Sequence, residues 1–186
     1  MRQLLSITAL TLLAFSIASA QKTNDAIAKQ IKSLKAEKAI TLGYDKGANT
    51  SKIMVTGDNF ADKEARAAGI QAMNFGMAFF YTGQAISTPP DLINFTFWVL
   101  TKKPKFAAAH SWTVTLAKET LNFGDARYVA RSGENMEYLN FKISRTDLTK
   151  IAAETNVKFK LGTAEFTITP AQLATFKNVL AVSDNH

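Results

Sequence analysis

The sequence predicts a single α+β domain, built mainly on an antiparallel β-sheet or flattened sandwich that is covered by helices. Two observations carry this prediction. Long stretches alternate large apolar residues with small or polar ones, as strands do, and helical spacing appears near the start, near the end and before the last hairpin. The chain has 186 residues, of which 47% are hydrophobic and 20% are charged, which is typical of globular domains. An all-β sandwich with decorating helices is the alternative.

The first twenty residues predict a cleaved signal peptide. They begin with Arg2, continue with an apolar stretch from residue 4 to residue 17, and end in Ala-Ser-Ala, which is a pattern that signal peptidases accept. The apolar stretch is short for a hydrocarbon core of about 30 Å, which disfavours an uncleaved anchor. We therefore expect a periplasmic or secreted protein with no transmembrane segment after cleavage.

The remaining chain divides into an N-terminal helix at residues 21–39 and one α+β domain at residues 40–186. The helix is predicted over Thr23–Ala39 because Ile27, Ile31 and Leu34 share one face while lysines occupy the others. Such a helix either packs its apolar stripe on the domain, which we favour, or lies on an anionic surface. The absence of cysteine favours a bacterial envelope over a eukaryotic secretory pathway.

Strand patterns follow the predicted helix. Residues Ser51–Thr56 form a short strand, Asp62–Ala68 a helical turn, and residues 70–83 a strand whose large side chains all share one face. Residues Leu92–Leu100 carry apolar side chains on both faces, which predicts a central strand covered on both sides. A loop is expected at Thr101–Lys105.

Further strands are marked by alternating apolar residues in the middle of the chain. The markers are Trp112, Val114 and Leu116 for one strand, and Leu139, Phe141 and Ile143 for another. Between them, residues 121–130 are less regular, and Gly124-Asp125 is predicted to form a turn.

The last quarter of the chain predicts a strand, helix, hairpin and helix in that order. Ser144 lies three residues before Asp147 and predicts the start of a helix at residues 145–154. In the hairpin, a turn at Gly162-Thr163 pairs large residues on one face and lysine with glutamate on the other. The pairs are Leu161 with Ala164, Phe159 with Phe166, Val157 with Ile168, and Lys160 with Glu165. Thr169-Pro170-Ala171-Gln172 is a capping box that starts a helix at residues 170–182.

The sequence offers little catalytic chemistry. It has no Cys and two His, which excludes thiol nucleophiles and Cys-ligated metals. The HExxH, GxSxG and phosphate-binding glycine motifs are absent, and His110 and Ser111 point to opposite faces if they lie on a strand. We expect no metal and no cofactor, and we favour a non-enzymatic protein. A carboxylate hydrolase is one alternative, with Glu119, Asp125, Glu134, Glu137, Glu154 and Glu165 as its candidate residues.

The basic charge indicates an anionic partner. The chain carries 22 Lys and Arg against 15 Asp and Glu, and Lys102, Lys103 and Lys105 cluster around Pro104 in a loop that we expect to make few contacts. We expect an exported binding module that uses these lysines to bind an anionic lipid, glycan or protein of the cell envelope. Nucleic acid is disfavoured because an exported chain without an aromatic and basic motif has little reason to meet it. A carrier of an apolar ligand is the other alternative, because 13 Phe could line a pocket.

Overall fold

The computed structural model describes residues 21–57, 59–61, 63–131 and 135–184, and it confirms the α+β fold with two antiparallel sheets. The predicted signal peptide, residues 1–20, lies outside these described residues. The six-stranded sheet contains, in spatial order, β1 (Ile40–Asp45), β2 (Thr50–Thr56), β3 (Ile70–Thr82), β4 (Leu92–Thr101), β8 (Met136–Ser144) and β7 (Arg127–Arg131). The four-stranded sheet contains β10 (Ala164–Thr167), β9 (Lys158–Leu161), β5 (Ser111–Thr115) and β6 (Thr120–Asp125). The helices are α2 (Lys63–Ala67), α3 (Arg145–Ala153) and α4 (Pro170–Asp184), and residues 21–33 are also helical.

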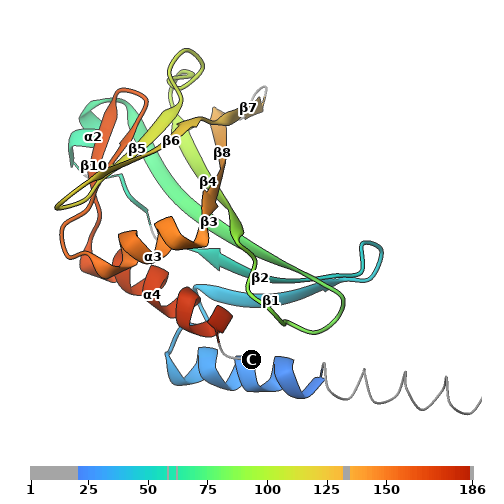
Figure 1. Cartoon of the computed structure of the whole chain (residues 1–186). Coiled ribbons are helices and arrows are strands. Elements are labelled where there is room, and N and C mark those ends of the chain that lie inside the picture. The colour runs from blue at the N-terminus through green and yellow to red at the C-terminus, as the bar shows by residue number, and fades with distance from the viewer. Residues whose placement is uncertain (1–20, 58, 62, 132–134, 185–186) are drawn as a thin grey trace, which may run out of the picture.

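An aromatic core joins the two sheets and the last helix. The Phe95 and Trp112 rings, from β4 and β5, have centroids 4.7 Å apart, and Trp112 contacts Phe159 of β9 at 5.1 Å. Phe176 of α4 contacts Phe75 of β3 at 5.1 Å. Figure 1 shows α3, α4 and the four-stranded sheet gathered on one side of the six-stranded sheet. Within the described residues, no helix combines the length and the apolar character needed to cross a membrane.

The N-terminal helix packs on the domain but ends earlier than predicted. Ile27 and Ile31 are buried, and the Gln30 amide donates to the backbone oxygen of Ala181 in α4. The helix stops at residue 33 rather than at Ala39, because Lys35 adopts a positive φ of 53°. A left-handed residue at this position closes a helix with its own backbone bonds, and a pattern of apolar spacing does not reveal it.

The structure confirms the predicted register of the final hairpin and the predicted capping box of the final helix. Leu161 pairs with Ala164 and Phe159 with Phe166, while Gly162 has the positive φ, 55°, that the turn requires. At the start of α4, the Gln172 side chain accepts from the backbone amide of Thr169 at 2.8 Å, and the Thr169 hydroxyl accepts from the amide of Gln172 at 3.3 Å. Ser144 caps α3 in the predicted way by accepting from the Asp147 amide at 3.0 Å.

The predicted turn at Gly124-Asp125 is wrong, because these residues belong to β6. Ser111 pairs with Asp125 but Thr113 pairs with Asn122, so β6 carries one extra residue, and Gly124 has φ 70°. This is a β-bulge with a left-handed glycine, which bends a strand without ending it. After the bulge the chain passes directly from the four-stranded sheet into β7 of the six-stranded sheet.

The prediction that β4 is covered on both sides is also wrong. The strand lies centrally between β3 and β8, and Phe95 and Phe97 on its inner face are buried. On its other face Leu92 is 58% exposed and Asn94 is exposed, because no segment that the structure describes packs there as a layer. Trp98 reaches partial burial by lying on the sheet itself, over Gly76 of β3.

Candidate functional site

The uncovered face of the six-stranded sheet, which we call the open face, is the candidate functional site. Strand register arranges its side chains in rows across the strands. The first row contains Val129, Tyr138, Trp98 and Asn74, and the second contains Arg127, Asn140, Thr96, Gly76 and Thr56. The third row contains Lys142, Asn94, Ala78, Met54 and Thr41, and the fourth contains Phe80, Lys52 and Gly43.

A groove crosses the middle of the open face. Its floor includes Ala78, whose small side chain leaves space between larger residues, and Gly76, over which the Trp98 indole lies. The larger hollow, of about 710 Å³, lies over β3, β4, β7 and β8, and a smaller one of about 200 Å³ lies over β1 to β4. Both hollows are lined by Ala78, Asn94 and Thr96, so they form one groove. The larger volume lies within the range of about 300–1,000 Å³ that is typical of ligand sites.

The groove is positively charged at the end nearest β7. Arg127 and Lys142 line the larger hollow, and both are exposed. Arg127 pairs with Asn140, and Lys142 follows two residues later on the same face of β8. Diagonal neighbours of this kind are about 7–8 Å apart in adjacent strands. Lys52 of β2 is a further cation of the open face, but it lies away from β7 and lines neither hollow.

These cations have no acidic partners in the described part of the chain. The ion pairs described there join Arg145 to Asp184 and Lys150 to Glu119, and neither pair lies on the open face. The four rows contain no Asp or Glu. The end of the groove at β7 and β8 therefore presents a positive potential that no carboxylate of these rows neutralises. Asp45, on the same face of β1 beyond Gly43, lies at the opposite edge of the sheet.

The groove is lined by amide and hydroxyl groups that both donate and accept hydrogen bonds. The Thr96 hydroxyl donates to the Asn140 side-chain oxygen at 2.9 Å, and the Asn140 amide donates to the backbone oxygen of Arg127 at 3.1 Å. These bonds hold Asn140 in one orientation beside the cations. Asn94 is exposed at the centre of the groove, where its amide remains accessible to a ligand.

Trp98 forms one wall of the smaller hollow. A Cβ atom placed on Gly76 would lie 2.5 Å from Cη2 of Trp98, so only glycine leaves room for the indole where it lies. The ring is half-buried against the sheet and keeps part of its surface open. From the sequence, the apolar side chain of Trp98 predicted a layer covering this face of β4. In the structure Trp98 instead lines the groove.

The predicted lysine loop is held by more hydrogen bonds than expected. Lys102 and Lys103 are exposed, but Lys105 is half-buried and its ammonium group donates to the backbone oxygen of Ala68 at 2.8 Å. The Lys105 backbone amide also donates to Glu137 at 3.0 Å. The expectation that this loop makes few contacts is therefore wrong at Lys105, whereas Lys102 and Lys103 are exposed.

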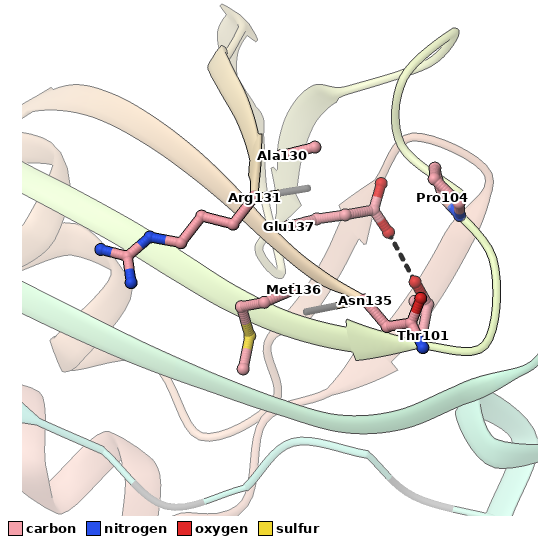
Figure 2. Close-up of a pocket in the computed structure, with 7 residues that line it drawn as sticks. All are labelled: Thr101, Pro104, Ala130, Arg131, Asn135, Met136 and Glu137. Atoms are coloured by element: carbon pink, nitrogen blue, oxygen red, sulfur yellow. Dashed lines mark hydrogen bonds between the residues drawn. The ribbon is translucent and has the colours of Figure 1, made fainter. Parts of the chain in front are cut away.

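Glu137 is a buried carboxylate that anchors this loop. It lies beside a hollow of about 290 Å³, and Figure 2 shows it directed toward Thr101 while Arg131 extends away from it. Only 1% of Glu137 is exposed. Its oxygens accept from the Thr101 hydroxyl at 2.9 Å and from the backbone amides of Lys105 and Phe106 at 3.0 and 2.8 Å.

The phenol of Tyr128 completes the set of donors around Glu137, at 3.0 Å. Burial raises the pKa of Tyr128 above its ordinary value, and the hydrogen bond to Glu137 and the charge of that carboxylate raise it further. Because structural donors occupy both oxygens of Glu137, this carboxylate has little capacity left for a substrate.

The other candidate carboxylates and His110 are placed as follows. Glu119 pairs with Lys150 and Glu165 faces Lys160 across the hairpin. Asp125 pairs with Ser111 in the four-stranded sheet, and Glu154 is the C-cap of α3. Glu134 lies outside the described residues. The His110 ring stacks on Tyr128 at 5.7 Å, and its Nδ1 lies 3.0 Å from the Phe106 oxygen. No group of three or more His, Cys, Asp or Glu that could hold a metal occurs among the residues that the structure describes.

Comparison with models of known protein families, with curated proteins and with solved structures found no match to this chain.

Proposed function

We propose that the protein is an exported, non-enzymatic module that binds an anionic component of the cell envelope in the groove of the open face. The observation that carries this proposal is the pair Arg127 and Lys142, two exposed cations beside a hollow of about 710 Å³ with no carboxylate in the surrounding rows. Unpaired like charges repel each other, and a bound anion relieves that repulsion. The leader pattern and the absence of cysteine support an envelope location.

The chemistry of the groove favours binding over catalysis. Its polar lining consists of amides, hydroxyls and permanent cations, including Asn94, Thr96 and Arg127. General acid and base catalysis usually requires a group that titrates near neutral pH, such as His or a perturbed carboxylate. The buried carboxylate Glu137 belongs to the inner face and holds the loop instead.

Charge reversal on the groove tests this proposal against the lysine loop. The variant R127E/K142E and the control K102E/K103E change the net charge equally, so only the position of the charge differs. Each cation near an anionic surface contributes about 1 kcal/mol. We therefore expect the groove variant to lose at least about tenfold in affinity for an anionic probe at low ionic strength, and the loop variant to lose less than about threefold.

Suitable probes are polygalacturonate, polyphosphate and vesicles that contain an anionic phospholipid, each measured by titration calorimetry. Binding that weakens in the groove variant and at raised salt supports the proposal, because both changes act on the same electrostatic attraction. Equal losses in the two variants would show that net charge alone matters. A loss confined to K102E/K103E, or a parent protein that binds none of the probes, would overturn the proposal.

A further inference from the structure

We propose that the ligand of the groove is an acidic polysaccharide, with one sugar ring stacked on Trp98 and its acidic groups held by Arg127 and Lys142. This inference rests on the proposed function and adds the chemical class of the ligand. It is carried by the juxtaposition of a fixed aromatic ring, a polar groove and a pair of cations on one face of the sheet.

Trp98 provides a fixed apolar platform. The indole lies over Gly76 and is half-buried, and its row neighbours are Tyr138 and Asn74. A ring held in place by the sheet loses little entropy when a ligand stacks on it. The C–H face of a sugar ring is weakly positive and apolar, and the negative face of an indole attracts such a surface.

The centre of the groove suits a ligand rich in hydroxyl groups. Thr96 and Asn140 form the row between that of Trp98 and that of Lys142, and Asn94 pairs directly with Lys142. Amides and hydroxyls donate and accept hydrogen bonds, as sugar hydroxyls do, so the two sets complement each other. The carboxylates of an acidic sugar can then form charge-assisted hydrogen bonds with Arg127 and Lys142.

The shape of the site favours a polymer over a membrane. Arg127 and Lys142 line a concave hollow. The headgroups of a membrane form a nearly flat surface, which cannot enter such a hollow easily. Six strands at about 4.8 Å spacing span about 24 Å. A linear polymer can follow this length across the strands and contact the cations, the amides and Trp98 together.

The spacing of aromatic rings disfavours single-stranded nucleic acid. Such ligands stack successive bases on neighbouring rings. On the open face, Phe80 is 46% exposed, but it lies six residues along β3 from Asn74, the partner of Trp98, which corresponds to about 20 Å. Tyr138, which is adjacent to Trp98, is covered by the Arg131 guanidinium at 5.2 Å from its ring. One available ring fits one stacked sugar better than a run of bases.

Tryptophan fluorescence gives a direct test because the two tryptophans differ in exposure. Trp112 is fully buried and Trp98 is partly exposed, so we expect acrylamide to quench mainly Trp98. We expect oligogalacturonate to protect Trp98 from quenching, whereas neutral dextran and polyphosphate do not. We expect Trp98→Ala to weaken oligogalacturonate binding about tenfold and polyphosphate binding less than twofold, because only the sugar ring loses a stacking partner.

Two further variants keep the test decisive. Trp98→Phe retains a ring and should recover most of the affinity that Trp98→Ala loses. Ala78→Leu fills the floor of the groove at a partly exposed position and should weaken binding of oligogalacturonate while the fold is retained.

The outcomes separate this inference from the proposed function. If R127E/K142E no longer binds oligogalacturonate but Trp98→Ala binds it like the parent, the proposal that the groove binds anions is supported. The proposal that a sugar ring stacks on Trp98 would then be wrong. If both variants bind like the parent, both proposals are wrong. Single-stranded DNA that binds more tightly than oligogalacturonate and protects Trp98 would identify a nucleic acid instead and overturn the inference.

Discussion

Glu137→Ala is expected to lower the free energy of unfolding by about 3–5 kcal/mol, because several buried donors lose their acceptor at once. The carboxylate accepts from the Thr101 and Tyr128 hydroxyls and from the backbone amides of Lys105 and Phe106. With alanine in its place, those donors face a hole that no other side chain fills. Denaturant titration measures the loss.

Two controls make the Glu137 result interpretable. Glu165→Ala removes an exposed glutamate of β10 and should change stability by less than about 0.5 kcal/mol. Glu137→Gln keeps the volume and one acceptor oxygen, so it should fall between the parent and Glu137→Ala. A loss below about 1 kcal/mol for Glu137→Ala would contradict the role of this carboxylate as the anchor of the loop.

Gly162→Val should destabilise the fold by about 2–4 kcal/mol, because it combines backbone strain with a steric clash. Gly162 has φ 55°, which β-branched residues resist, and its amide donates to the Ser111 oxygen at 2.7 Å. A Cβ atom at this position would lie 2.3 Å from the backbone oxygen of Ala109. The backbone of two segments would therefore have to move apart.

Thr163→Val is the matched control for Gly162→Val. Thr163 occupies the next turn position and is exposed, so the same β-branched side chain should cost less than about 1 kcal/mol there. Thermal and denaturant unfolding of the two variants gives the comparison. Equal losses would mean that the turn does not depend on glycine at its first position.

The hairpin and the caps could be predicted from sequence because their evidence is local. Both faces of the hairpin support one register, with Phe159 opposite Phe166 and Lys160 opposite Glu165, and the structure has those pairs. The bulge at Gly124 could not be predicted in this way, because glycine followed by aspartate is common in turns and the difference depends on the partner strand.

The candidate site could not be predicted because it depends on contacts between distant strands. Arg127 and Lys142 become neighbours only through the pairing of β7 with β8. In the sequence, Trp98 predicted a layer covering this face of β4. In the structure, Gly76 has no side chain, so the Trp98 indole can lie on the six-stranded sheet. Lys105 looked like a free cation because the sequence does not show that Ala68 and Glu137 hold it.

Chemical shift mapping of the isotope-labelled protein during titration with oligogalacturonate shows where the ligand binds. We expect the largest amide shift changes at groove residues on β3, β4 and β8, namely Gly76, Ala78, Asn94, Thr96 and Asn140. The amides of Lys102 and Lys103 should move little. Shift changes confined to the loop at residues 101–105 or to the helix at residues 21–33, with the groove unaffected, would show that the groove is not the binding site.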